Sequence, residues 1–345
     1  MADSAPKLGK GWHVGDCATI VNRFGLVCTC IVLVLLPANA RAREAQDWFL
    51  TISNGQGLEV CNDARVFAFF SALNAMGFDA GFASRKFPVP RMSYHPVRLQ
   101  VRERVFSKRS SIASAFDPFF DAHPEPIDLY LSFLLEPTGA LGERKKTFDG
   151  LSEALRHFDQ SFGIAELHTA AQGEYRLLQR AYFTALDGSI VRLRHRLGAG
   201  QAPPLTIFVN LLDEDDRLRA IPMADGSLSI SVGPSRELLT FAIVRTYASM
   251  LIAPVLRRII GTWAAGPSLL RRAREAGAPE ETLEAFASRV MTNAAARWAL
   301  QIPGDRLGVG ELGIGDAAML FDGSQAVEPL LTEALKRIEV RRSTQ

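Results

Sequence analysis

Residues 227–258 constrain the fold most, since they join a strand pattern directly to a long apolar helix pattern. At the start of this stretch Leu228, Ile230 and Val232 alternate with serines, which is the two-residue period of a half-buried strand. An Asp-Gly hairpin signal precedes the strand and a Gly-Pro pair ends it. We therefore expect residues 227–232 to pair antiparallel with a neighbouring strand.

The helix pattern that follows is apolar on nearly every face between residues 238 and 256. We expect one continuous helix at residues 236–252, buried inside its domain, with Ser235 as its N-cap. Pro254 cannot donate a hydrogen bond to the carbonyl of Met250, and its ring crowds that turn, so the helix should bend near the proline.

One side of this helix carries a polar patch, because positions i, i+1 and i+4 project in the same direction. Its members are Arg245, Thr246 and Ser249. The segment 241–256, FAIVRTYASMLIAPVL, resembles the active-site helix of bacterial zincin-like, metallopeptidase-related families of unknown function, whose members read roughly H-E-[FL]-x-H-x-[FL]-[VI]-N-P-[LV]. In zincins this helix follows an edge strand, its two histidines bind zinc, and its glutamate activates water.

The resemblance places Arg245 at the first His, Thr246 at the Glu and Ser249 at the second His. A carboxylate on a following helix supplies the third ligand in zincins of the Glu-ligand type, and Glu284 matches that position. No motif position keeps a zinc ligand or a catalytic carboxylate. The resemblance therefore implies a zincin-like scaffold that binds no zinc and hydrolyses no peptide bonds. The alternative is an ordinary buried helix with satisfied polar groups.

The charge of Arg245 adds to this loss, because a fixed positive charge repels a dication. We expect the guanidinium to pair with a nearby carboxylate or with carbonyl oxygens, since an unpaired buried charge is costly. The positions of the histidines also give no zinc site. The chain has six histidines, none of which lies after residue 195, and no two of them have the i, i+4 spacing of zinc ligands on one helix face. We expect neither a metal nor a cofactor.

The first 42 residues have the pattern of a signal peptide. Phe24–Leu36 is a 13-residue apolar run, preceded by Arg23 and followed by small residues at Ala-x-Ala spacing. The run is shorter than the about 20 residues that a membrane-spanning helix needs. We expect export to the periplasm or the medium, with the mature chain beginning at Arg41 or Arg43, and translation starting nearer Val21. The alternative is a retained anchor through residues 24–36.

The remaining chain has a neutral charge balance. The 42-residue segment holds four of the 39 basic and two of the 37 acidic residues, which leaves 35 of each. A neutral balance gives no electrostatic reason to expect nucleic acid or an anionic membrane as a partner. Cys61 is the one cysteine left, so an intramolecular disulfide and a cysteine zinc cluster are excluded, and a buried, inert thiol is expected.

The order of patterns along the chain is helices, then sheet, then helices, which is typical of an α+β fold. We expect one zincin-like domain, residues 43–345, with a helical part at 48–200 and a sheet-plus-helix part at 203–345. The N-terminal stretches 69–81 and 95–105 also resemble the helical region of the zincin-like families. The first predicted helix is capped by Asn62-Asp63 and ended by Gly77. The other predicted elements are helices at 96–106, 112–120, 127–135, 151–162 and 164–186, a small antiparallel sheet of strands at 205–212, 217–223 and 227–232, and C-terminal helices at 279–300 and 327–339.

Other motifs are better explained without a function. The acidic run 213–216 lacks the ligand spacing of a calcium loop and indicates a solvated turn. Gly308–Gly313 fits G-x-G-x-x-G, but no clear strand precedes it and too few residues follow for a dinucleotide site. The basic runs 192–196 and 271–274 lie near predicted helix ends, where positive charge suits the helix dipole. The chain has no G-x-S-x-G motif of a serine hydrolase.

Three classes of function remain. The first is an exported, catalytically inactive metallopeptidase-like protein that binds a peptide or protein ligand. The second is an active hydrolase with unrecognised catalytic residues, and the third is a structural protein associated with the cell envelope. The degenerate motif favours the first class over the second. A groove along the polar side of the central helix would favour it over the third.

Overall fold

The computed structural model describes residues 51–78, 95–122, 127–136, 148–197, 202–260, 266–275 and 277–302, with positions 331, 332, 334 and 336. These residues belong to one compact unit, Phe49–Gln345. The predicted signal peptide, with its proposed start and cleavage positions, lies outside the described residues. So do Gly308–Gly313 and most of the predicted helix 327–339.

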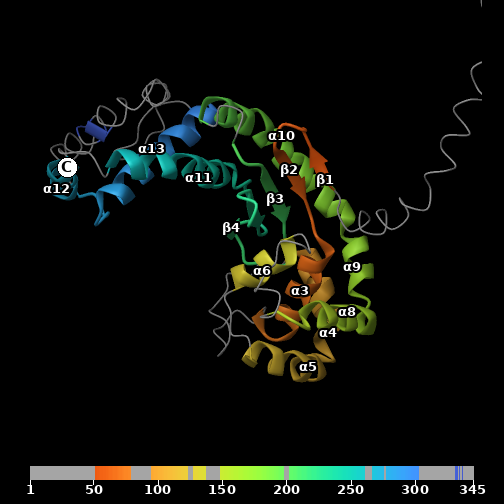
Figure 1. The fold of residues 1–345 in the computed structure, drawn as a ribbon. Coiled ribbons are helices and arrows are strands. Elements are labelled where there is room, and N and C mark those ends of the chain that lie inside the picture. Colours follow the sequence, from red (N-terminus) through yellow and green to blue (C-terminus); the bar gives the residue numbers. More distant parts are fainter. Residues whose placement is uncertain are drawn as a thin grey trace, which may run out of the picture. The chain divides into compact units, whose positions relative to one another are not determined.

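The fold is α+β, as predicted, and the described residues form ten helices and a five-stranded sheet (Figure 1). The helices are α3 (Ala64–Ala75), α4 (Pro96–Phe106), α5 (Arg109–Ala122), α6 (Ile127–Leu135), α8 (Leu151–Phe162), α9 (Ile164–Ala170), α10 (Gln172–Leu197), α11 (Thr240–Ile260), α12 (Gly266–Glu275) and α13 (Leu283–Leu300). Helices α4, α6 and α8 have the predicted bounds. The predicted helix 164–186 is two helices, because the chain turns at Ala171 between α9 and α10.

The strands are β1 (Thr51–Ser53), β2 (Leu58–Cys61), β3 (Leu205–Val209), β4 (Leu218–Pro222) and β5 (Leu228–Val232), in the spatial order β1-β2-β3-β5-β4. The predicted antiparallel pairing of β5 is confirmed, since Ala220 of β4 lies opposite Ile230 of β5. A hairpin turn at Gly226, whose φ is +82°, joins these two strands.

The prediction of an antiparallel sheet is wrong for the interior, where β2, β3 and β5 run parallel. Strand β3 could not pair with β4 as a simple hairpin, because β5 lies between them. The two N-terminal strands were also missed. They have only three and four residues, and they lie in a part of the chain predicted to be helical, yet β2 pairs with β3 from Leu58–Leu205 to Cys61–Phe208.

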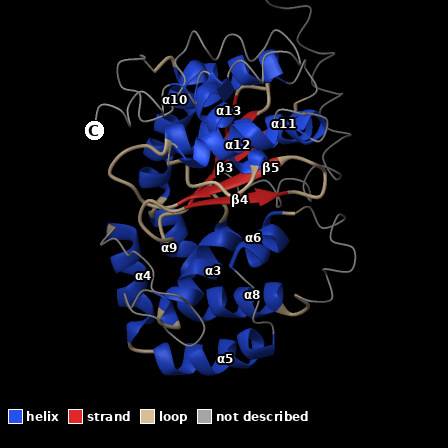
Figure 2. Cartoon of the chain, turned by 90° about the vertical axis from the view of Figure 1, so that its left-hand side faces the viewer, coloured by secondary structure: helices blue, strands red, loops and turns tan. Residues whose placement is uncertain are grey.

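Strand β5 is buried on both faces, so the prediction of a half-buried strand is wrong. All five residues are buried, including Ser229 and Ser231. The alternation instead separates two buried faces, because the sheet lies between α3 and α6 on one side and α10, α11 and α13 on the other (Figure 2). Central parallel strands are commonly covered in this way.

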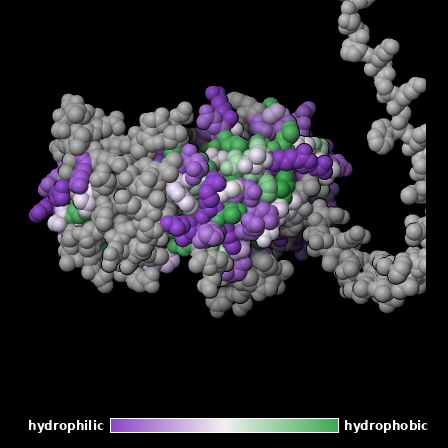
Figure 3. Space-filling model, turned by 90° about the horizontal axis from the view of Figure 1, so that it is seen from above, coloured by the Kyte–Doolittle hydropathy of each residue, from purple (hydrophilic) through white to green (hydrophobic). Residues whose placement is uncertain are grey.

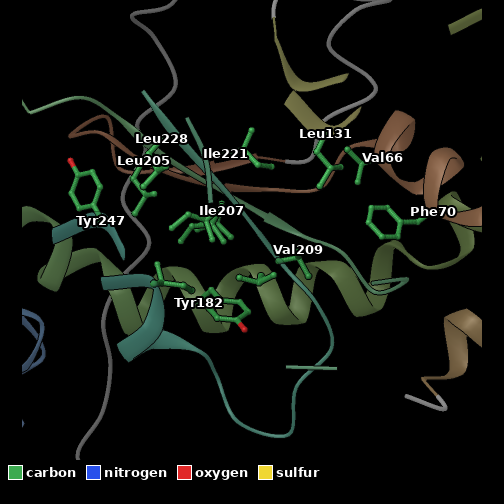
Figure 4. Packing of buried hydrophobic residues seen from close by; sticks show 14 of the residues in the cluster. Val66, Phe70, Leu131, Tyr182, Leu205, Ile207, Val209, Ile221, Leu228 and Tyr247 are labelled. Carbon is green, nitrogen blue, oxygen red and sulfur yellow. The ribbon is translucent and has the colours of Figure 1, made fainter. Parts of the chain in front are cut away.

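The core packs against both faces of the sheet. Figure 4 shows Ile207 and Val209 pointing towards α10, where Tyr182 lies, whereas Ile221 points to the other face, towards Leu131 of α6. All five side chains are at most 4% exposed. Burying side chains of this size contributes about 1.5–3 kcal/mol each, so the two-sided packing holds the strands that frame the site.

An ion-pair network fixes the edge strand β4 on the α6 side. The Nε atom of Arg219 donates to Asp213 at 2.7 Å, and Nη1 donates to Asp128 of α6 at 2.8 Å. The solvated turn predicted for residues 213–216 is therefore wrong at Asp213, whose side chain is fully buried. Asp213 is buried because the Arg219 side chain, which points from β4 into the protein, binds the Asp213 carboxylate there.

Candidate functional site

Helix α11 is shifted towards the C-terminus relative to its predicted bounds. It begins at Thr240, because the Ser235 hydroxyl donates to Asp216 at 2.5 Å instead of capping a helix. It continues through Pro254 to Ile260. The bend near the proline remains a prediction.

One face of α11 is buried and the other is open, so the prediction of a buried helix holds for one face and is wrong for the other. The buried residues are Ile243, Val244, Tyr247, Ala248, Ile252 and Leu256. On the opposite side Arg245 is exposed, and Thr246, Ser249 and Met250 are partly exposed. Helix α13 lies beside α11 and covers only part of its circumference (Figure 1).

A pocket of about 540 Å³ opens over this polar side. We call it the β4–α11 pocket. Its walls come from β4, β5, α11 and α13, and the lining residues are Ala220, Pro222, Leu228, Arg245, Thr246, Ser249, Met250, Ala253, Ala285, Ser288, Arg289 and Thr292. The three polar residues singled out in the sequence therefore share one concave surface.

Glu284, the proposed third ligand position, lies outside the pocket lining. It is exposed in the first turn of α13, which begins at Leu283 rather than at Pro279, with Thr282 as N-cap. The pocket wall is formed by the neighbouring face of that helix. The sequence analysis missed this face, although its spacing of i, i+3, i+4 and i+7 was a usable signal. Its members are Ala285, Ser288, Arg289 and Thr292.

Two hydroxyl groups of the pocket are engaged by their own helices. The Thr246 hydroxyl donates to the carbonyl of Ala242 at 2.8 Å, and the Thr292 hydroxyl donates to the carbonyl of Ser288 at 2.7 Å. For Ser249 the described residues offer no hydrogen-bond partner. Within the described part of the chain, the Ser249 hydroxyl is therefore free to bind a ligand.

The two arginines of the pocket differ in their partners. Arg289 forms an ion pair with Glu280, and its Nη2 atom donates to the Glu280 carboxylate at 3.2 Å. Arg245 has no acceptor among the residues that the structure describes, so its predicted pairing is wrong. The physical reason is its exposure: a hydrated guanidinium does not need a protein partner.

Among the residues that the structure describes, the lining contributes no imidazole, thiol or carboxylate. Its polar side chains are two arginines, two serines and two threonines, none of which is an ordinary zinc ligand. None of these described lining side chains can act as a general base towards the serines. The donor set fits the binding of a ligand with acceptor groups better than it fits hydrolysis.

A second pocket, of about 420 Å³, lies where α10 and α13 end; it is lined by Val191, Arg192, His195, Arg196 and Trp298. The Nε atom of Arg192 donates to the carbonyl of Ala299 at 2.9 Å. The basic run lies near a helix end, as predicted, since Arg194, His195 and Arg196 are in the last turn of α10, while Arg192 binds the C-terminal end of α13. The surface seen in Figure 3 mixes hydrophobic and hydrophilic residues in its described part, rather than presenting one continuous field of either kind.

Two titratable groups lie buried away from both pockets. Cys61 is buried, as predicted, and its burial raises the pKa of the thiol. Burial also lowers the pKa of His168 to about 4, and its Nε2 atom lies 3.0 Å from Oδ1 of Asn62. A thiol kept protonated is a poor nucleophile, and a neutral buried imidazole with a side-chain partner is a structural element.

No helix in the described ranges is long and apolar enough to cross a membrane. Comparison of the chain with protein-family models, with curated proteins and with solved structures gives no match.

Proposed function

We propose that this protein is an exported, metallopeptidase-like binding protein that holds an extended peptide in the β4–α11 pocket and does not hydrolyse it. The observation that carries the proposal is the pocket itself, which joins the β4 edge of the sheet to a polar helix face. Its described lining holds no metal-ligating or basic catalytic side chain. The zincin-like part of the proposal is supported by the segment 241–256 and by its position on the helix that follows the β4–β5 hairpin.

The outer edge of β4 offers main-chain hydrogen bonds to such a peptide. Gly233 donates to the carbonyl of Arg217 at 2.8 Å, and Met223 donates to that of Ser227 at 3.0 Å, so residues of odd number on β4 face β5. Antiparallel pairs alternate, and the backbone groups of Leu218 and Ala220 therefore point outwards. No strand in the described part of the chain pairs with this edge.

A peptide added to this edge would place alternate side chains in the pocket. Ala220 and Pro222 line the pocket, and both are small or compact, which leaves room beside the strand. Strand addition supplies affinity through main-chain hydrogen bonds and specificity through pockets for every second side chain. Pro222 has no N–H, so it ends the ladder of donors at one side and limits the length of the bound segment.

The proposal favours binding over hydrolysis because the pocket serines have no available base beside them in the described part of the chain. A serine nucleophile needs an adjacent base, and the carboxylate of Glu280, which lies outside the lining, is engaged by the lining residue Arg289. Binding is favoured over a purely structural role because a concave surface with free donors is typical of ligand sites.

The test of binding uses two neighbouring positions of α13. Ala285 is exposed and lines the pocket, whereas Glu284 is exposed and does not. Tryptophan at Ala285 should fill the pocket and weaken binding of an uncharged extended peptide pool by about tenfold or more, whereas tryptophan at Glu284 should leave it unchanged. Calorimetry of each variant measures the affinities. Equal affinity in both variants, or no binding by the unmodified protein, would refute the proposal.

Inactivity and export have their own measurements. Elemental analysis after purification without chelators should find no stoichiometric zinc, and a peptide-cleavage screen should find no product. Zinc together with cleavage that is lost on metal removal would contradict the proposal. Mass spectrometry of the protein from its native host should show a chain that begins at Arg41 or Arg43. A cytoplasmic product that keeps the apolar run would contradict export.

A further inference from the structure

The charges around the β4–α11 pocket are unequal in a way that points to a class of ligand. Arg289 and Glu280 compensate each other, with side chains that are 29% and 11% exposed. Arg245 is the pocket cation that has no counter-charge among the described residues. The three groups together carry one uncompensated positive charge, which lies on the α11 wall.

A second free donor lies one helical turn from Arg245. Ser249 occupies the i+4 position on the same helix and lines the same pocket. Its hydroxyl has no partner in the described residues, whereas the hydroxyls of Thr246 and Thr292 are engaged by carbonyl groups. A guanidinium and a hydroxyl on one helix face provide converging donors for an oxyanion.

We propose that Arg245 and Ser249 form a recognition site for a carboxylate group carried by the bound peptide. The planar guanidinium matches the two oxygens of a carboxylate, and such a pair is stronger than a neutral hydrogen bond. A single uncompensated charge suits a monoanion. The carboxylate of Glu280, which is paired with Arg289, disfavours the higher charge of a phosphate dianion.

The position of β4 adds a requirement for spacing. Side chains of an extended peptide alternate between two faces, and only one set turns towards the pocket wall on which Arg245 lies. The carboxylate is either an Asp or Glu side chain of that set or the C-terminal group of a peptide that ends at the pocket. This inference rests on the proposed peptide-binding function and specifies its ligand.

The experiment compares pools of short peptides, of about seven residues, with blocked ends. One pool carries a central Glu, a second carries Gln at that position, and a third carries Gln and a free C-terminal carboxylate. The Glu pool or the free-carboxylate pool should bind about tenfold more tightly than the blocked Gln pool, as expected for one charge-assisted hydrogen-bonded pair at a partly open site. The tighter of the two identifies the source of the carboxylate.

Variants on α11 assign the effect to its residues. Arg245→Met should abolish the preference for a carboxylate while the blocked Gln pool binds as before, and Ser249→Ala should reduce the preference. Arg257→Met is the matched control, because Arg257 is exposed on the same helix and does not line the pocket. It should leave the preference unchanged. Circular dichroism and thermal melting of each variant confirm that it is folded.

The outcomes separate this inference from the proposed function. If all three pools bind equally to the unmodified protein, the carboxylate site is refuted and peptide binding stands. If the preference persists in Arg245→Met, or if Arg257→Met removes it, the assignment to Arg245 is wrong. If inorganic phosphate competes better than acetate, the ligand class is wrong. If no pool binds, both proposals fail.

Discussion

Replacing Asp213 with asparagine should destabilise the protein far more than the same change at Asp128, although both carboxylates bind the same guanidinium. Arg219 lies 2.7 Å from Asp213 and 2.8 Å from Asp128. The side chain of Asp213 is 0% exposed, that of Asp128 is 48% exposed, and that of Arg219 is 5% exposed. The two pairs therefore differ in burial. They also differ in geometry, because Arg219 donates to Asp213 through both Nε and Nη2 and to Asp128 through Nη1.

The magnitudes follow from the local dielectric. At 2.7 Å and an effective dielectric constant of about 20, the attraction between Asp213 and Arg219 is roughly 6 kcal/mol, whereas near the dielectric of water the attraction to Asp128 is about 1.5 kcal/mol. Asparagine keeps a hydrogen-bond acceptor, so we expect Asp213→Asn to lower the free energy of unfolding by about 3 kcal/mol. Asp128→Asn should lower it by about 0.2–1 kcal/mol.

Urea unfolding followed by circular dichroism measures both values, provided that the slope of the transition stays constant. Arg219→Met tests the other partner and should cost about 3–5 kcal/mol, because it leaves the Asp213 carboxylate buried without a cation. The double variant Asp213→Leu with Arg219→Met should recover part of that loss. Equal costs for the two asparagine variants would refute the argument from burial.

Two further predictions concern pH and backbone packing. Burial lowers the pKa of His168 to about 4, with Asp63 opposing the shift, so between pH 6.5 and 4 the unfolded chain binds more protons. The contribution of His168 to the free energy of unfolding is fully present above pH 6.5 and falls by about 3 kcal/mol as the pH drops to 4. Urea unfolding across that range measures the change, and a free energy of unfolding that does not vary with pH would contradict the prediction. Gly233→Ala should lower the free energy of unfolding by about 1–3 kcal/mol, because the new Cβ would collide with the Glu214 carbonyl oxygen. Gly173→Ala is the control: its new Cβ meets no atom, so the change should be neutral or stabilising. Equal melting temperatures for the two variants would contradict this.

The sequence predicts elements whose pattern is local. Helix α11 and strand β5 follow from apolar spacing, and α4, α6 and α8 follow from spacing with proline, glycine and aspartate punctuation. The start of α11 was misplaced because Ser235 bonds to Asp216, a partner 19 positions earlier in the chain. Local capping rules cannot anticipate a tertiary acceptor.

Strand direction and burial depend on the whole chain. The parallel pairing of Leu58 with Leu205 joins distant segments, and β2 has too few residues to show a period. Asp213 is buried against Arg219 of β4, which donates to it and also to Asp128 of α6. A run of four acidic residues carries no sign of such a partner, so a solvated turn was the natural interpretation of that run.

The candidate site shows the same division. The face shared by Arg245, Thr246 and Ser249 follows from helix geometry, and all three line the pocket. The α13 wall of the pocket is not predicted, because the zincin resemblance points to a carboxylate ligand on this helix and therefore to Glu284. The face that lines the pocket lies one residue further on, starting at Ala285 and carrying Arg289.

The role proposed for Arg245 is electrostatically opposite to that of the motif position that it matches in the zincin resemblance. In the zincin pattern this part of the helix holds a dication, whereas a guanidinium repels a dication and attracts a carboxylate. The open side of α11 is what makes the reversal tolerable, since an exposed Arg245 keeps its hydration when no ligand is bound. A peptide carboxylate that replaces this water must accept hydrogen bonds from both the guanidinium and Ser249 that are as strong as those of the displaced water. For this reason the pocket should discriminate a carboxylate from an amide more strongly than it discriminates among uncharged side chains.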